Sequence, residues 1–321
     1  MTNNNKLYDL VIIGASAAGC AASVYASRRG LYFIVVSKDI GGEVALSGEI
    51  ENWPGIVHTD GIALAKNFED HMKSYNPKIE TGVEVTGIAQ EKKTHLVNGK
   101  DGSGAAKTYR TKAVLIASGI HPRELGVSGE KELKGKGISY CTVCDGPLFK
   151  NKVTATVGAG NSALESALMM AGIAKKAYVL TKYPESERGG FPKGETILVK
   201  KLKVLKNIEI IYSANTTEIK GNGFVSGLVY EDMQTKEKKE LALQGVMIHV
   251  GQIPNSSFVD CAKKTPAGEI EVDMRAATSC PGVFAAGDVT TVAYKQIAIA
   301  AGQGVIAALS AIDYINKWIT D

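Results

Sequence analysis

YDLVIIGASAAG at residues 8–19 and KVTATVGAGNSA at residues 152–163 follow one plan. In each stretch a run of apolar and β-branched residues predicts a buried strand, and a glycine-containing loop follows it. The sequence after each loop predicts a helix and then a second strand. The first glycine and the end of the second strand are 23 positions apart in both copies, from Gly14 to Ser37 and from Gly158 to Thr181. The sequence therefore predicts an internal duplication of a strand–helix–strand unit.

The loops of both copies suit a dinucleotide. The first glycine of such a loop permits a tight turn, the second lets the backbone approach a pyrophosphate, and the third small residue lets the helix pack on the strand. The pyrophosphate then lies at the helix N-terminus, where unpaired N–H groups and the helix dipole favour anions. Ser16 replaces the second glycine of the first copy, and Ala163 the third of the second copy. Two such units in one chain predict a flavoprotein that holds FAD in one unit and a nicotinamide donor in the other.

The composition is that of a globular protein with two domains. The 321 residues are 45% hydrophobic and 22% charged, and the net charge of +4 comes from basic residues spread along the chain. A scattered excess of this size does not indicate a nucleic-acid-binding protein. We find no run of about 18 apolar residues, and the polar start lacks the apolar core of a signal peptide, so no membrane span is expected. The sequence predicts a cytoplasmic protein.

The five cysteines divide into a close pair and three isolated residues. Cys20, Cys261 and Cys280 are expected to be small buried side chains rather than parts of a disulfide framework. Cys141 and Cys144 form a C-x-x-C pair just before the second glycine loop, which is typical of half a zinc site or of a redox dithiol. Zinc needs two further ligands with compatible spacing, and the five histidines stand far apart. No metal is predicted, and the pair is interpreted as a redox-active dithiol.

Two acids beside these motifs have both a chemical and a structural interpretation. Asp145 either protonates a thiolate of the dithiol or begins an Asp-Gly turn. Asp288 follows an apolar strand at residues 282–286 in a Gly-Asp pair. A carboxylate in that position can accept hydrogen bonds from hydroxyl groups of a cofactor, or it is a turn residue.

The chain resembles the low-molecular-weight thioredoxin reductases over essentially its whole length. The matches are Gly14–Gly19, Gly41-Gly42, Glu51–Gly55, Cys141-x-x-Cys144-Asp145-Gly146, Gly158–Ala163, Val250-Gly251 with Pro254-Asn255, and Gly287-Asp288 with Gln296–Ala298. CDGPLFK and TTVAYKQI also resemble the reductase half of the alkyl hydroperoxide reductase flavoprotein. That flavoprotein carries additional thioredoxin-like domains before its reductase half. Because this chain starts directly at the first strand, we expect it to lack them.

The resemblance implies an α/β fold with two Rossmann-like, three-layer ββα dinucleotide-binding domains, as in class II pyridine nucleotide-disulfide oxidoreductases. Residues 1–119 and 249–321 would form a discontinuous FAD-binding domain, and residues 120–248 an inserted NAD(P)H-binding domain that carries the dithiol. Hinges near Gly119-Ile120 and Val250-Gly251 would let the nicotinamide and the dithiol meet the flavin in turn. A homodimer is expected from the resemblance alone.

The resemblance also implies a thioredoxin-disulfide reductase in which electrons pass from NAD(P)H to FAD, then to the Cys141–Cys144 disulfide, then to a thioredoxin-like protein. Cys144 would face the flavin, Cys141 would attack the partner disulfide, and Asp145 would be the acid. The residues expected around FAD are Gly14, Ser16, Ala17, Gly19, Ser37, Lys38, Gly42, Glu43, Asn52, Gly119, Gly287, Asp288, Gln296, Ile297 and Ala298. Those expected around the nicotinamide nucleotide are Gly158, Gly160, Asn161, Ser162, Lys182 and Arg188.

The donor is where this chain departs most from the family pattern. NADPH-dependent relatives carry a His-Arg-Arg motif and a later arginine for the 2′-phosphate, where this chain has Thr181, Lys182 and Tyr183, then Glu187 with Arg188 beside it. The acid that would favour NADH is also absent at Thr181. Lys182 slightly favours NADPH as the electron donor, with NADH or ferredoxin as alternatives. Glu43 stands where the family usually has glutamine.

Three alternative functions stay open at this point. One is a ferredoxin- or NADH-dependent reductase of a glutaredoxin- or thioredoxin-like protein that supplies a peroxiredoxin. Another is a ferredoxin–NADP reductase of the same fold, whose activity would survive the loss of both paired cysteines. The last is a flavin-binding or redox-sensing protein without turnover.

Overall fold

The computed structural model describes residues 7–47 and 49–318, and the chain divides into two compact units. Unit 1 comprises Met1–His121 with Ile253–Asp321, and unit 2 comprises Pro122–Gln252. These boundaries lie two and four residues beyond the expected ones, at 121/122 and 252/253. Two short paired strands, β9 (Ile120–Pro122) and β18 (Gln252–Pro254), carry the chain from one unit to the other and back.

Unit 1 is built on a seven-stranded sheet in the order β5-β2-β1-β8-β7-β6, with β19 beside β8. Strands β1, β2, β5, β8 and β19 run parallel, β7 pairs antiparallel with β8, and β6 pairs antiparallel with β7. Its elements are β1 (Leu7–Ala15), α1 (Ala17–Arg28), β2 (Phe33–Ile40), α2 (Gly42–Ala45), β3 (Glu49–Ile50), β4 (Thr59–Asp60), α3 (Gly61–Lys73), β5 (Lys78–Thr81), β6 (Val83–Glu91), β7 (Thr94–Asp101), β8 (Ala106–Ile116), β19 (Val283–Ala285) and α8 (Ile297–Asn316).

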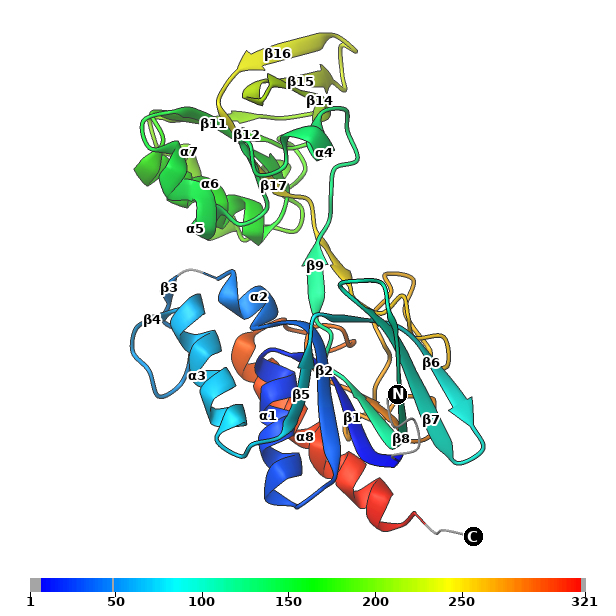
Figure 1. Ribbon diagram of the computed structural model, residues 1–321. Coiled ribbons are helices and arrows are strands. Elements are labelled where there is room, and N and C mark those ends of the chain that lie inside the picture. The colour runs from blue at the N-terminus through cyan, green and yellow to red at the C-terminus, as the bar shows by residue number, and fades with distance from the viewer. Residues whose placement is uncertain (1–6, 48, 319–321) are drawn as a thin grey trace. The chain divides into compact units, whose positions relative to one another are not determined.

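The central strand β1 is buried on both of its faces. Leu10 and Ile12 belong to the core under the helices, and Val11 and Ile13 belong to a second core on the opposite face, beside β6 and β7. This explains why its sequence is an unbroken apolar run rather than an alternating one. Figure 1 shows α1, α3 and α8 together on one face of this sheet.

Helix α8 bears on the expectation that no segment spans a membrane. By length and composition it is the one helix in the described part of the chain that could do so, although Gln303, Ser310 and Asp313 interrupt its apolar residues. Its small residues have a packing role, because a Cβ at Gly304 would come within 2.1 Å of the Ala18 carbonyl oxygen of α1. Ala300, Ala307 and Ala308 lie in the same core. The packing of α8 against α1 accounts for these small residues.

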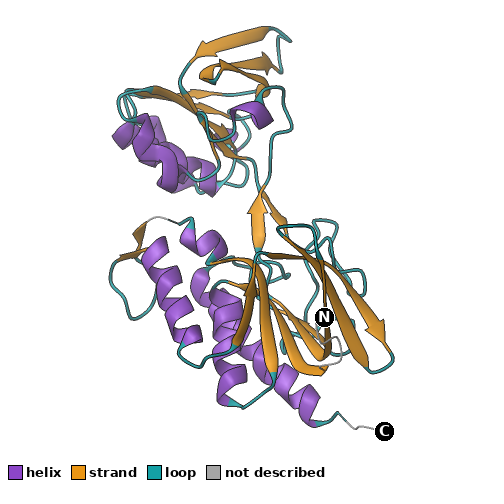
Figure 2. Cartoon of the chain, in the orientation of Figure 1, coloured by secondary structure: helices purple, strands orange, loops and turns teal. Residues whose placement is uncertain are grey.

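Unit 2 has a five-stranded parallel sheet in the order β10-β17-β11-β12-β13 and an antiparallel sheet β14-β15-β16. Figure 2 shows the larger helices of this unit gathered on one side of the parallel sheet, while the short helix Glu130–Leu133 lies apart from them. Its elements are α4 (Glu130–Leu133), β10 (Ile138–Ser139), α5 (Thr142–Asp145), the 3₁₀ turn Gly146–Phe149, β11 (Val153–Gly158), α6 (Asn161–Ile173), β12 (Lys176–Leu180), the 3₁₀ turn Arg188–Gly190, α7 (Thr196–Lys203), β13 (Ile208–Ile211), β14 (Ala214–Asn222), β15 (Phe224–Asp232), β16 (Lys238–Ala242) and β17 (Gly245–His249).

Both strand–helix–strand copies are present, as β1–α1–β2 and β11–α6–β12, each with its two strands parallel and adjacent. Their second strands do not end at matching positions. β2 continues past Ser37 to Ile40, whereas β12 ends before Thr181. The reason is local, because the buried Thr181 hydroxyl donates to the Gly190 carbonyl at 2.6 Å and so belongs to the loop that follows.

The three cysteines outside the pair are not all isolated. Cys20 and Cys280 are buried, and burial raises the pKa of each thiol to about 12. Cys261 is half-buried, and it contributes to the raised pKa of Cys280 through a hydrogen bond and its charge. Burial of Cys20 and Cys280 was expected, but the interaction of Cys280 with Cys261 was not.

Candidate active site

A cavity of about 1120 Å³ opens in unit 1 where β1, β2 and β8 end. This edge of a parallel sheet is where nucleotides bind in doubly wound folds. Thirteen of the residues expected around FAD line it: Gly14, Ser16, Ala17, Ser37, Lys38, Gly42, Glu43, Asn52, Gly119, Gly287, Asp288, Gln296 and Ile297. The fold thus gathers residues from both ends of the chain into one site.

The first glycine loop tolerates serine at its middle position because of its neighbours. A Cβ at Gly14 would come within 2.3 Å of the Ala117 carbonyl oxygen, so glycine is required where β1 turns toward α1. Ser16 precedes α1 and turns its hydroxyl away from the helix, donating to the Gly41 carbonyl at 2.6 Å. This contact gives the Ser16 hydroxyl a protein partner.

Two residues expected around FAD do not line the cavity. A Cβ at Gly19 would come within 1.9 Å of the Gly14 carbonyl oxygen, so Gly19 allows α1 to pack on β1. Ala298 is half-buried in the first turn of α8, one position past the lining residue Ile297. Gly19 therefore has a packing role, and Ala298 lies outside the cavity wall.

Two carboxyl groups of the cavity have pKa values above their usual range. Burial raises the pKa of Glu43, and the negative charges of Asp288 and Asp39 add to the effect, while His121 opposes it. Burial also raises the pKa of Asp288, while the charge of Lys295 opposes it. Within residues 7–47 and 49–318, the buried Asp288 Oδ1 has no hydrogen-bond partner. An acceptor left in this state fits a hydroxyl group supplied by a ligand.

The tertiary structure adds cavity residues that the sequence did not single out. Asp39, His121, Asn255 and Lys295 all line it. Asn255 links two chain segments, because its amide donates to the Ser118 carbonyl at 2.8 Å and its Oδ1 lies 2.5 Å from His121 Nδ1. For Asp39 the sequence offered a signal, because it is an acid near the end of the second strand of the unit.

Two expected residues from distant parts of the sequence meet at the cavity wall. Asn52 Nδ2 donates to Gln296 Oε1 at 3.1 Å, although the two are 244 positions apart. This contact joins the segment after α2 to the start of α8. Amide groups held in this way can present further donors and acceptors to a bound ring system.

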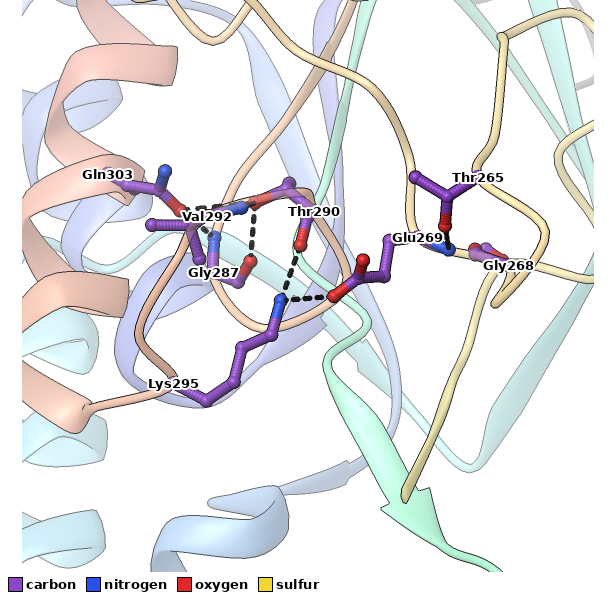
Figure 3. A network of polar contacts seen from close by, with 9 residues as sticks. Thr265, Gly268, Glu269, Gly287, Thr290, Val292, Lys295 and Gln303 are labelled. Atoms are coloured by element: carbon purple, nitrogen blue, oxygen red, sulfur yellow. Dashed lines mark hydrogen bonds and ion pairs between the residues drawn. The ribbon is translucent and has the colours of Figure 1, made fainter. Parts of the chain in front are cut away.

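A polar network fixes the loop that carries Gly287 and Asp288 (Figure 3). The Gly287 N–H donates to Gln303 Oε1 at 2.8 Å, and the Thr290 hydroxyl donates to the Gly287 carbonyl at 2.8 Å. Lys295 Nζ donates to the Thr290 carbonyl at 2.5 Å and lies 2.8 Å from Glu269 Oε1. The network holds the loop in place. It also positions the Lys295 ammonium group, whose charge opposes the rise in the pKa of Asp288.

The paired cysteines of unit 2 form a disulfide at the start of α5. Cys141 is half-buried and Cys144 exposed, and the Cys144 N–H donates to Cys141 Sγ at 3.2 Å. That amide and the start of the helix would also stabilise a thiolate at Cys141. Asp145 is the last residue of α5 and is half-buried. In residues 7–47 and 49–318, no three His, Cys, Asp or Glu side chains gather as a metal site.

The second glycine loop repeats the geometry of the first. A Cβ at Gly158 would come within 2.2 Å of the His249 carbonyl oxygen, just as a Cβ at Gly14 would approach the Ala117 carbonyl oxygen. Gly160 precedes α6, and Ser162 is exposed in its first turn. Asn161, by contrast, exchanges two hydrogen bonds with Glu195, from its amide to the carboxylate at 2.9 Å and from the Glu195 N–H at 2.8 Å.

The loop after β12 carries the residues expected to select the donor. Lys182 is exposed, and its Nζ lies 5.4 Å from the centre of the Tyr183 ring. Arg188 is exposed and donates to the Pro192 carbonyl at 3.1 Å. The next residue, Lys193, forms a β-bridge with Gly160 and was not anticipated from the sequence. Three cationic side chains therefore stand on the loop that reaches the second glycine loop.

Comparison with known proteins agrees with this geometry. Residues 8–304 match the family described as pyridine nucleotide-disulphide oxidoreductase. The chain belongs to this family.

Named relatives of the family are similar along nearly the whole chain. An alkyl hydroperoxide reductase component of Pseudomonas putida is 39% identical over 317 residues, which are 98% of this chain and 59% of the relative. The chain thus spans about three-fifths of the length of the curated relative. The thioredoxin reductase of Lactococcus lactis superposes with a TM-score of 0.85 at 30% identity, covering 97% of this chain and 100% of the other. That of T. acidophilum has a TM-score of 0.82 at 41% identity, covering 96% and 99%.

Membership in the pyridine nucleotide-disulphide oxidoreductase family confirms three expectations. The fold class is α/β with two Rossmann-like units. The chain belongs to a family of oxidoreductases. FAD and a pyridine nucleotide are its cofactors.

Proposed function

We propose that the chain is a disulfide reductase that transfers electrons from a pyridine nucleotide to a thioredoxin-like protein. The observation that carries the proposal is the Cys141–Cys144 disulfide, which lies in the same unit as the second glycine loop and has one exposed member. The similarity to thioredoxin reductases over nearly the whole chain supports a thioredoxin-like acceptor. We further propose that unit 1 is the FAD-binding domain and unit 2 the NAD(P)H-binding domain.

The cavity of unit 1 fits FAD on two observations. Its volume of about 1120 Å³ suits a large cofactor, and the buried Asp288 Oδ1 lacks a protein partner in the described part of the chain. Gly14, Ser16 and Ala17 at the start of α1 would hold the pyrophosphate, and Asp288 a sugar hydroxyl. When bound, FAD supplies two-electron transfer between the nicotinamide and a disulfide.

The two cysteines would then reduce the partner by thiol–disulfide exchange. The Cys141 thiolate attacks one sulfur of the partner disulfide, so that a mixed disulfide forms and one partner thiolate leaves. The Cys144 thiolate next attacks Cys141 Sγ, which restores the Cys141–Cys144 disulfide and releases the second partner thiolate. The partner gains two electrons and two protons in all. Asp145 would protonate the thiolate that leaves on the flavin side when the disulfide is reduced again.

The donor preference we propose is NADPH over NADH by about tenfold, which corresponds to about 1.4 kcal/mol. Lys182 and Arg188, with Lys193 beside them, offer positive charge to a 2′-phosphate, and Glu187 opposes them. Lysine meets a phosphate as a point charge, without the paired contacts of arginine. A small preference follows from this set of charges.

A second candidate acceptor is a peroxiredoxin system. The relative from Pseudomonas putida is named as one component of an alkyl hydroperoxide reductase, and the chain matches 59% of its length. We propose that a glutaredoxin- or thioredoxin-like protein would connect this chain to a peroxiredoxin. A cytoplasmic location and a homodimer are further predictions.

The test is anaerobic addition of NADPH, or separately NADH, to the FAD-loaded protein while flavin absorbance is followed. We expect bleaching by the nucleotide and recovery on addition of a thioredoxin disulfide. Cys141→Ser and Cys144→Ser should each abolish disulfide reduction, whereas Cys261→Ser, a half-buried cysteine of unit 1, should keep it. Full activity in both paired variants would refute a catalytic dithiol. If reduced ferredoxin bleached the flavin and neither nucleotide did, ferredoxin would replace the pyridine nucleotide as the proposed donor.

A further inference from the structure

A chain of side-chain hydrogen bonds joins the second glycine loop to the dithiol helix within unit 2. His249 is the last residue of β17 and lies beside Gly158 of β11. Its Nδ1 is 2.8 Å from Ser162 Oγ in the first turn of α6, and its Nε2 is 2.8 Å from Thr142 Oγ1. Thr142 is buried directly after Cys141, and its hydroxyl lies 2.5 Å from Ser166 Oγ. One imidazole therefore bridges the two functional segments of the unit.

The bridge has a direction that depends on which ring nitrogen carries the proton. Burial lowers the pKa of His249 to about 4, so the ring is neutral near pH 7 and carries a single N–H. If Nδ1 holds the proton, it donates to Ser162, and Thr142 donates to Nε2. If Nε2 holds the proton, it donates to Thr142, and Ser162 donates to Nδ1. The two tautomers reverse the hydrogen bonds of both hydroxyl groups.

A phosphate accepts hydrogen bonds but cannot donate them when fully ionised, and this makes the two tautomers unequal. With the proton on Nδ1, Ser162 accepts from His249 and keeps its own hydrogen for an anion at the start of α6. With the proton on Nε2, the Ser162 hydrogen is already used by the ring. An anion bound there therefore favours the first arrangement, in which Thr142 donates to His249.

We propose that His249 is a positioning residue that couples pyrophosphate binding at Ser162 to the hydrogen bonds of Thr142 on the dithiol helix. The inference rests on the proposed function, since it requires the pyridine nucleotide to bind at the second glycine loop. It extends that function by giving unit 2 an internal link between donor binding and the segment that holds the disulfide. The histidines entered the sequence argument only as candidate zinc ligands, so this role was missed.

Calorimetric titration of the FAD-loaded, oxidised protein with NADP⁺, and separately with NAD⁺, tests the first half of the link. His249→Leu and Ser162→Ala should each weaken binding about fivefold to tenfold, and the double variant should be no weaker than the weaker single one. His249→Asn should recover most of the affinity, because its amide can replace Nδ1 toward Ser162. The control variant His95→Leu removes a buried histidine of unit 1, and its nucleotide dissociation constant should stay within twofold of the wild-type value. The inference would be overturned if the losses of binding free energy were additive in the double variant. It would also be overturned if His249→Leu had the same nucleotide dissociation constant as the wild type.

Nitrogen-15 NMR of histidine-labelled protein tests the tautomer directly, with the His249 signals assigned by their loss in His249→Leu. In the complex with NADP⁺ the ring should carry its proton on Nδ1. A bound ring protonated on Nε2 contradicts the coupling, even if His249→Leu binds weakly for structural reasons. If the wild type bound neither nucleotide, the proposed function would itself fail. Normal binding by the wild type together with the Nε2 tautomer contradicts only the inference.

Discussion

Single residues decide the shape of both nucleotide loops through steric contacts with a neighbouring strand. Gly14 and Gly158 each lie where a Cβ would meet the carbonyl oxygen of an adjacent chain segment, Ala117 in one case and His249 in the other. Asp288 and His249 are polar side chains whose titration is set by burial. Both are half-buried, and burial raises the pKa of Asp288 and lowers that of His249, which favours the neutral form of each.

Replacement of Asp288 by alanine should act in opposite directions on binding and on stability. FAD affinity should fall about tenfold to 150-fold, the cost of about 1.5–3 kcal/mol for a lost hydrogen bond to a charged group. The apoprotein should be at least as stable as the wild type, because a buried carboxylate with an unpartnered oxygen is removed. Fluorescence titration with FAD and urea unfolding measure the two effects. Glu84→Ala, at an exposed lining position, is the control and should change FAD affinity less than twofold.

Acidification should destabilise the protein through His249. Its ring nitrogens face the hydroxyls of Ser162 and Thr142, and burial lowers its pKa from 6.5 to about 4. Between these two values the unfolded chain binds more protons, so this contribution is complete above pH 6.5 and is lost as pH falls through 4. The loss should reach about 3 kcal/mol. Urea unfolding from pH 7 to pH 4 should show a smaller slope in His249→Leu, and equal slopes would contradict this origin.

Among the elements, α8 illustrates how apolar sequence serves close helix packing. It lies against α1, and small residues at the contact let the two backbones approach. Gly304 faces the Ala18 carbonyl, whereas Gly302 is exposed with no atom within 4 Å of a built Cβ. Two glycines of one helix therefore stand in opposite environments.

Alanine at these two glycines should have effects of opposite sign. Gly304→Ala should lower the free energy of unfolding by about 1–3 kcal/mol, because the new methyl group would overlap Ala18 and force the helices apart. Gly302→Ala should raise it by about 0.5–1 kcal/mol, since alanine favours a helix interior and meets nothing. Urea unfolding of the two variants measures both. A stable Gly304→Ala protein would show that α1 and α8 can separate without cost.

At the scale of the whole molecule, unit 2 is an insertion in unit 1. Both hydrophobic cores of unit 1 are made only of residues that belong to unit 1. Where the chain passes between the units, the Arg123 N–H donates to the Gly251 carbonyl at 2.9 Å, and the Asn255 N–H donates to the Gly119 carbonyl at 2.9 Å. The two crossing segments are thus close enough to be joined directly.

Replacing residues 124–250 by a two-residue Asn-Gly turn should leave a folded unit 1. A two-residue turn suits two paired strands, and a unit of about 190 residues can form its own core. The shortened protein should bind FAD within about threefold of the intact chain and should show no bleaching by NADPH or NADH. Flavin fluorescence and circular dichroism measure binding and folding. A folded product that failed to bind FAD would mean that the cavity depends on unit 2.

The features that could be predicted from the sequence are those encoded within short stretches. The runs at Tyr8–Ile13 and Val153–Val157 read as strands because both faces are buried, and the two glycine loops follow from the turn that each strand must make. The Cys141–Cys144 pair is visible from its spacing alone. The ends of the second strands were less predictable, because Thr181 leaves its strand for a contact with Gly190.

What the sequence by itself determined is therefore the duplicated unit, the dithiol and most of the glycines around the proposed FAD cavity, since each depends on neighbours within a few positions. The tertiary structure alone decided which distant residues meet. It joined Asn52 to Gln296, brought Lys295 near Asp288, and placed His249 between Ser162 and Thr142. Such contacts depend on how strands are ordered in a sheet and how loops close over their ends. No periodicity along the chain records that arrangement.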